Sequence, residues 1–292
     1  MDFQKEIIGL VEQKIDKFKK ANDEIWAFAE TRFGEFKSSA LLQELLKGEG
    51  FKITTNIGEA ETAFIAEWGS GKPVVGFLGE FDALSYLSQE ADNPVHTPIV
   101  QGAPGHGCGH NTLGAGSASA AVAVKDYLEA NKLPGTVRFY GCPAEENAGG
   151  KTFMVRAGAF DDCDIAITWH TGSTTAIMGT GMLANFRVFF TFHGQSAHAA
   201  GTPHLGRSAL DAEELMNVGV NYMREHMIDQ ARVHYAVTNP GGTAPNVVQP
   251  EAQVLYAIRA PKVTQVRELL ERIKKIAQGA ALMTETTVDI RQ

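Results

Sequence analysis

The sequence predicts two domains: an α/β domain with a mostly parallel sheet, followed by a ferredoxin-like β-α-β-β-α-β domain. Strand-like runs alternate with helical runs over residues 1–181, which is typical of a parallel sheet covered by helices. Over residues 182–292 the order of expected elements changes to strand, helix, strand, strand, helix, strand. The chain has 292 residues and 44% hydrophobic content, enough for a sizeable core. We therefore place the domain boundary after residue 181.

The first domain opens with helical spacing of its apolar residues. Asp2 is placed to cap a helix whose pattern runs toward a break near Gly34. A second helix is expected at 38–47. Two strand-like runs, 62–68 and 73–78, flank a Gly-rich turn, and this arrangement predicts a β-hairpin.

The rest of the first domain contains a long irregular loop, of a kind that is often functional. An Ala- and Gly-rich helix follows the loop, and its small side chains permit close packing against a sheet. We expect the loop at 83–107 and this helix at 111–130. A strand at 136–140, a short helix at 150–157 and a last strand at 164–168 are expected to follow. In the second domain, strands are expected at 185–192, 232–237, 253–258 and 286–290, and helices at 209–226 and 263–278.

Composition excludes several classes of function. The net charge is -8, which argues against nucleic acid as the main partner because phosphate binding needs clustered Lys and Arg. No apolar run approaches the roughly 20 residues of a membrane span, and the amphipathic N-terminus lacks the apolar core of a signal peptide. Three cysteines, Cys108, Cys142 and Cys163, do not form a disulfide framework in a chain this long. A cytoplasmic location is expected.

Potential metal ligands follow several of the expected strands. In open α/β sheets, functional groups gather at the carboxyl ends of strands, so we expect these side chains to lie near one another. They supply thiolate, imidazole and carboxylate groups, the ligand chemistry of Zn, Mn or Co. The residues concerned are Glu80, Asp82, Cys108, His110, Glu145, Glu146 and His170.

Each of these features has an ordinary reading when taken alone. A Cys-x-His pair is usually incidental, and paired glutamates are mostly solvated surface. His170 at a strand end can be a satisfied histidine. Asp82 can cap a helix, form a turn, or orient a metal-binding histidine from behind. Their joint occurrence in this order is much more specific than any single part.

The joint pattern resembles the aminoacylase/carboxypeptidase family of dinuclear metallohydrolases. Within that family it is most similar to the amidohydrolase branch that includes p-aminobenzoyl-glutamate hydrolases and related dipeptidases. The resemblance covers essentially the whole chain. It rests on 81–84, 105–111, 143–146, 169–170, 194–200, 203–212, 224–226, 233–235 and 245–248.

The resemblance implies a role for each matching residue. The first domain would hold two divalent metal ions, Zn or Mn, through Cys108, His110, Glu146 and His170, with Glu145 as the general base. The second domain would be a lid and dimerisation domain. Its His198 would reach the active site of a partner subunit and stabilise the oxyanion, and Asn246 and Arg259 would bind substrate. A homodimer formed through the lid, or a place as one subunit of a heteromer, follows from the same resemblance.

The second-domain residues also have ordinary readings. His198 lies in a stretch of small residues and can be a loop histidine. Asn246 follows a proline and can be a turn residue. Arg259 at a strand end can be a solvated charge. His106, His204 and His234 are interpreted as structural or surface residues.

The chain departs from the family pattern in three ways. Glu80 stands where many relatives carry a metal-binding histidine, which weakens a metal role for this position. Asn111 replaces an aspartate common in this branch. The family's chain returns after the lid to add strands and a last histidine ligand, and no such segment is present here. We therefore expect a fragment or a naturally truncated chain, which binds one metal well and the second poorly and leaves a sheet face uncovered.

Two hypotheses of function follow. The first is a metal-dependent amidohydrolase that cleaves an N-acyl or N-aroyl amino acid, such as p-aminobenzoyl-glutamate, or a dipeptide. The second is a truncated, non-catalytic protein that pairs with an intact subunit through its lid.

Overall fold

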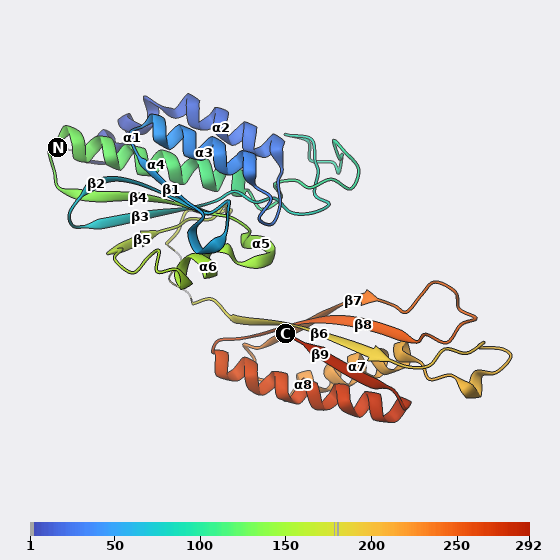
Figure 1. The fold of residues 1–292 in the computed structure, drawn as a ribbon. Coiled ribbons are helices and arrows are strands. Elements are labelled where there is room, and N and C mark those ends of the chain that lie inside the picture. Colours follow the sequence, from blue (N-terminus) through green and yellow to red (C-terminus); the bar gives the residue numbers. More distant parts are fainter. Residues whose placement is uncertain (1–2, 178, 180) are drawn as a thin grey trace. The chain divides into compact units, whose positions relative to one another are not determined.

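The structure is a computed structural model, and it describes residues 3–177, 179 and 181–292 (Figure 1). The chain forms two compact units, Met1–Thr175 and Ala176–Gln292. The cap expected at Asp2 lies outside the described residues. No helix in the described part of the chain is both long and apolar enough to span a bilayer.

The first unit is built on a five-stranded mixed sheet. Its strands lie in the order β1 (Lys52–Thr55), β2 (Phe64–Ser70), β4 (Gly135–Cys142), β3 (Val74–Glu80) and β5 (Ile165–Ile167). The expected parallel arrangement is confirmed for β4, β3 and β5, whereas β2 runs antiparallel to both of its neighbours, β1 and β4.

The hairpin expected between β2 and β3 is wrong. Both strands pair with β4, which lies between them. All but one of the β4 residues are buried, so this strand needs a partner on each side and covering groups on both faces. Strand β1 was not expected from the sequence.

Helices cover both faces of this sheet (Figure 1). The first four lie on one face: α1 (Phe3–Glu12), α2 (Ile15–Phe28), α3 (Phe36–Gly48) and α4 (His110–Ala130). The short helices α5 (Glu145–Ala148) and α6 (Gly150–Arg156) lie toward the other face, and α5 was not expected. The single helix predicted at the N-terminus is divided, because a turn at residues 13–14 separates α1 from α2.

Small residues let α4 approach its neighbours closely, as its composition predicted. A β-carbon at Gly114 would lie 2.7 Å from the Glu80 carbonyl oxygen, and one at Gly116 would lie 2.9 Å from the Trp169 ring. Ser117 accepts a hydrogen bond from Trp169 Nε1 at 3.1 Å and donates one to the Leu78 carbonyl oxygen at 2.8 Å. These contacts fix the start of α4 against the carboxyl end of β3.

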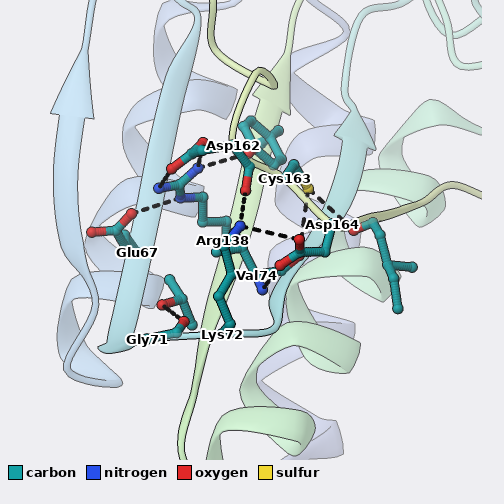
Figure 2. Close-up of polar contacts among 11 residues, drawn as sticks. Glu67, Gly71, Lys72, Val74, Arg138, Asp162, Cys163 and Asp164 are labelled. Atoms are coloured by element: carbon teal, nitrogen blue, oxygen red, sulfur yellow. Dashed lines mark hydrogen bonds and ion pairs between the residues drawn. The ribbon is translucent and has the colours of Figure 1, made fainter.

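A polar cluster links the strands of this sheet on the side away from the carboxyl end of β3 (Figure 2). Arg138 Nε donates to Glu67 at 2.6 Å, and its Nη2 donates to Asp162 at 2.8 Å. Lys72 Nζ donates to the Asp162 carbonyl oxygen at 2.9 Å and to Asp164 at 3.1 Å. Since this cluster lies where β3 and β5 begin, it ties the strands together away from their carboxyl ends.

The second unit is an antiparallel sheet with two helices. Its strands lie in the order β7 (Arg232–Asn239), β8 (Glu251–Ala260), β6 (Ala184–His193) and β9 (Thr287–Arg291). Helices α7 (Ala209–Met223) and α8 (Val263–Thr284) pack on one face of this sheet. Short 3₁₀ turns occur at Pro203–Leu205 and Arg224–His226 in this unit and at Ile57–Glu59 in the first unit. The predicted β-α-β-β-α-β order is confirmed. Alternate residues of β6 and β8, such as Val188, Phe190, Val254 and Ile258, form the core beneath these helices.

Candidate metal centre and associated residues

His110 and Asp82 form the buried base of the candidate site. Asp82 directly follows β3, and His110 is the first residue of α4. His110 Nδ1 lies 2.9 Å from Asp82 Oδ1, and Asp82 Oδ2 accepts a hydrogen bond from the Glu146 backbone N–H at 3.0 Å. The side chain of His110 is 0% exposed and that of Asp82 is 1% exposed. Asp82 therefore fixes both the histidine ring and the start of the segment that carries Glu146.

The charges of this pair support each other. Burial raises the pKa of Asp82, but hydrogen bonds from His110 and from the Glu146 backbone outweigh it and hold the pKa below its usual value. Burial lowers the pKa of His110, but the hydrogen bond to Asp82 and the charges of Asp82, Glu80 and Glu146 raise it overall. Asp82 is thus kept ionised behind a histidine that faces several carboxylates.

Cys108 and His170 come together from segments far apart in the chain. Cys108 Sγ lies 3.3 Å from His170 Nε2, and Thr171 Oγ1 donates a hydrogen bond to the Cys108 carbonyl oxygen at 3.0 Å. The His170 ring lies edge-on to the His110 ring, with centroids 5.8 Å apart. Burial, followed by the nearby carboxylate of Glu146, raises the pKa of the Cys108 thiol to about 12. A thiolate here therefore requires a cation beside it.

The donor atoms of this cluster fit a metal ion. His110 Nε2 and Glu146 Oε1 are buried, lie 3.9 Å apart and form no hydrogen bond among the described residues, although His110 Nε2 also faces the Glu80 carboxylate at 3.1 Å. Buried polar atoms of native proteins normally have partners, so these two are placed as if for a ligand. Potential ligand atoms from Cys108, His110 and His170 all lie within 4.8 Å of one another. A histidine whose other nitrogen contacts a carboxylate is the usual arrangement of a metal ligand.

The structure adds Lys151 to this region, beside Glu80, which the sequence already placed there. Lys151 on α6 forms an ion pair with Glu80 Oε1, while Glu80 Oε2 has no hydrogen-bond partner in the described ranges and lies 3.1 Å from His110 Nε2. Potential ligand atoms of Glu80, His110 and Glu145 also lie within 4.8 Å of one another. The sequence identified Glu80 as an acid in a histidine position but carried no signal for its pairing with Lys151, 71 residues away.

Glu145 lies beside these groups at the start of α5. Burial, followed by the charge of Glu80, raises the pKa of Glu145 above its usual value. A carboxylate with raised basicity is suited to accept a proton. His106, interpreted as structural, donates from Nε2 to the Ile25 carbonyl oxygen at 3.0 Å, and burial lowers its pKa to about 4.

The predicted substrate residues of the second unit lie on its loops and on β8. His198 and Asn246 occupy adjacent loops, joined by a hydrogen bond from the Ala199 backbone N–H to the Asn246 carbonyl oxygen at 2.9 Å. His198 Nδ1 accepts hydrogen bonds from the backbone N–H groups of Ala200 and Gly201 at 3.3 and 3.1 Å. These bonds occupy Nδ1, and Nε2 of this exposed histidine forms no hydrogen bond within the described residues. Arg259 is exposed near the end of β8.

Comparison with known families assigns the chain to one of them. Residues 76–289 match the family described as Peptidase family M20/M25/M40. The chain belongs to this family. The family includes dinuclear metal-binding peptidases, as the sequence motifs predicted, and the described residues include groups that could hold metal ions.

Two curated relatives of this M20 chain cover most of its length. One subunit of the p-aminobenzoyl-glutamate hydrolase of Escherichia coli (strain K12) is 53% identical over 281 residues, which are 96% of this chain and 58% of that protein. The Xaa-Arg dipeptidase of Mus musculus is 29% identical over 293 residues, which are 96% of this chain and 63% of that protein. The chain thus spans less than two thirds of the length of either relative.

A solved structure shows the same fold. A dinuclear metal-binding peptidase of the M20 family from Bacillus subtilis matches with a TM-score of 0.62 and 20% sequence identity, covering 94% of this chain and 73% of that one. This match supports the arrangement of an α/β unit followed by an antiparallel sheet with two helices.

Proposed function

We propose that this chain is the metal-binding and lid part of an amidohydrolase that cleaves N-acyl or N-aroyl amino acids. The substrate would resemble p-aminobenzoyl-glutamate, with a dipeptide as the related alternative. The observation that carries the proposal is the placement of His110. Its Nδ1 contacts Asp82, and its buried Nε2, which forms no hydrogen bond within the described ranges, lies 3.9 Å from Glu146 Oε1. Potential ligand atoms of His110, Cys108 and His170 all lie within 4.8 Å of one another. This oriented ligand set favours an enzyme over a non-catalytic partner.

The proposed ligands of two divalent ions, Zn or Mn, are Cys108, His110, Glu146 and His170. Mixed thiolate, imidazole and carboxylate donors accept either metal. When bound, the ions would supply Lewis acidity that polarises the scissile carbonyl group and acidifies water. Asp82 would hold the His110 ring in the tautomer that presents Nε2.

Glu145 is the proposed general base. Its carboxylate would remove a proton from the attacking water and later deliver that proton to the leaving amine nitrogen. Its raised pKa supports this exchange, because a more basic carboxylate takes a proton from water more readily. His198, presented by a partner subunit, would donate a hydrogen bond to the oxyanion, and Asn246 and Arg259 would bind the substrate.

The proposed assembly is a dimer through the second unit, or one subunit of a heteromer. Support for the heteromer comes from the E. coli hydrolase, because two of its different subunits are similar to this chain, at 53% and 29% identity. A cytoplasmic location is proposed because all three cysteines are free thiols.

Glu145→Ala tests whether Glu145 acts as the general base while Glu146 binds metal. With Mn or Zn added, the variant is expected to lose hydrolysis of p-aminobenzoyl-glutamate by at least about 100-fold, the usual contribution of a general base, and to keep its metal content. Metal is measured by elemental analysis and hydrolysis by product formation. Glu44→Ala, an exposed glutamate on α3, is the matched control. Loss of metal from Glu145→Ala would contradict the assignment and make Glu145 a ligand beside Glu80 and His110.

A further inference from the structure

The sheet of the second unit has one face that its helices do not cover. Helices α7 and α8 pack on the face formed by residues such as Val188, Val254 and Ile258. Because side chains alternate along a strand, the other face is formed by the intervening residues. We call this second surface the open face. The strand register shows which residues lie opposite one another on this face, and each such set is called a row.

Charge is distributed unevenly along the open face. Its first row contains Arg232, Arg259 and Asn185, and its second row contains His234, Ala257 and Arg187. At the far end, Thr191 lies opposite Asp289 and His193 lies opposite Glu251. From Arg187 to Thr191 is four residues, or about 13 Å of strand. The arginine end is therefore separated from the strand carboxylates on this face.

Two of these arginines have no polar partner within the described ranges. Arg187 and Arg259 are exposed, and neither forms a hydrogen bond or an ion pair with any residue of those ranges. Arg232 differs, because its guanidinium donates to the backbone carbonyl groups of Asp229 and Ala231. The carboxylates at the far end pair with a histidine instead, since Asp289 lies 3.1 Å from His193 Nε2.

The register brings these like charges close together. Arg232 lies directly opposite Arg259, an arrangement that is destabilising for like charges. Arg187 is diagonal to Arg259 across β6 and β8, a spacing of about 7–8 Å between neighbouring positions. Between them lie the short side chains of Asn185 and Ala257. Two guanidinium groups without a polar partner in the described ranges thus lie at neighbouring positions of the same face, an arrangement that suits a ligand with two negative charges.

We propose that Arg187 and Arg259 together bind the two carboxylates of an acidic leaving amino acid. Arg259 binds the α-carboxylate, and Arg187 binds the side-chain carboxylate and sets the preference for glutamate over neutral residues. This inference rests on the proposed amidohydrolase function and extends it to the class of the leaving amino acid. Arg187 is then a specificity-determining residue that none of the sequence motifs includes.

The test compares two probes that differ only in one charge. N-(4-aminobenzoyl)-L-glutamate and N-(4-aminobenzoyl)-L-glutamine are titrated into the full, chelator-treated chain by calorimetry, so that binding is measured without hydrolysis. The wild-type chain is expected to bind the glutamate compound at least about 10-fold more tightly, the ratio for one charge-assisted hydrogen bond. Arg187→Gln is expected to remove this preference while leaving the affinity for the glutamine compound unchanged. Arg187→Lys is expected to retain part of it.

Two controls make the result specific to this position. Arg259→Gln is expected to lower the binding affinity for both probes equally, because both carry the α-carboxylate. Arg267→Gln, an exposed arginine on α8, is expected to change neither affinity. Equal binding of the two probes by the wild-type chain, or an intact preference in Arg187→Gln, would overturn the proposal. Failure of the proposed function would look different, as absent hydrolysis in the metal-loaded chain while the preference for glutamate persists.

Discussion

Both units of the chain bury carboxyl groups, but those of the first unit have charged or strongly hydrogen-bonding partners and that of the second unit does not. In the first unit, Asp82 is buried against His110, and Glu80 is paired with Lys151. In the second unit, Glu213 on α7 is 0% exposed, accepts only a long hydrogen bond of 3.4 Å from Asn217, and forms no ion pair within the described residues. Tyr256 completes this second network by donating to Asn217 at 2.5 Å.

The different partners produce opposite pKa shifts. Hydrogen bonds from His110 and the Glu146 backbone lower the pKa of Asp82 despite burial. Burial raises the pKa of Glu213 to about 7, with only a weak opposing hydrogen bond from Asn217. Burial alone therefore favours a neutral carboxyl group, whereas burial with donors preserves a charge. The first arrangement is suited to a cation site and the second is a feature of a packed core.

Of these two buried carboxylates, Asp82 is expected to show the larger effect when its charge is removed. Asp82→Asn is expected to weaken divalent metal binding by about 10–100-fold, because the neutral amide no longer holds the His110 ring and the Glu146 backbone together. Affinity for Zn or Mn is measured by competition with a chromogenic chelator. Asp162→Asn, which removes the same charge from the Arg138 cluster at the other end of the sheet, is the matched control. Equal metal affinities in both variants would show that Asp82 is only a structural turn residue.

A smaller effect is expected in the second unit. Below pH 4.5, Glu213 is neutral in both the folded and unfolded chain. Between pH 4.5 and about 7, the unfolded chain loses a proton that the folded unit keeps, so the free energy of unfolding falls as pH rises. The side chain in Glu213→Gln is neutral at every pH. The free energy of unfolding of this variant is expected to exceed that of the wild type by roughly 1–3 kcal/mol at about pH 8, and by much less at about pH 5.

Hydrogen exchange of the α7 amides measures this difference, because local protection reports the stability of that unit. Glu268→Gln, which changes an exposed glutamate on α8, serves as its control, because the charge of Glu268 does not contribute to the raised pKa of Glu213. If the gain for Glu213→Gln were the same at the acidic and the alkaline pH, ionisation would not be its cause. The contrast between the two buried carboxylates would then be lost.

Much of this architecture could be predicted from local patterns. The helix at 110–130, the strands that flank it and the order of elements in the second unit follow from periodicity and composition. The gathering of Asp82, Cys108, His110, Glu146 and His170 follows from a general property of parallel sheets, whose carboxyl strand ends meet at one edge. Their individual roles as ligands remain predictions.

Pairing between distant segments could not be predicted in this way. The hairpin expected between β2 and β3 fails because β4, about 60 residues further along, takes the place between them. The Glu80–Lys151 ion pair and the neighbouring Arg187 and Arg259 depend on helix placement and strand register. Neither leaves a local pattern in the sequence, since each residue alone resembles a solvated charge.

Cobalt binding to Cys108 tests the central claim most directly, because thiolate ligation has its own absorption band. Titration of the metal-free chain with Co²⁺ is expected to produce a thiolate-to-cobalt charge-transfer band that is absent from Cys108→Ser and intact in Cys163→Ser, whose thiol faces backbone carbonyl groups. A wild-type chain that binds cobalt without this band, or a band that survives in Cys108→Ser, would contradict the proposed metal centre.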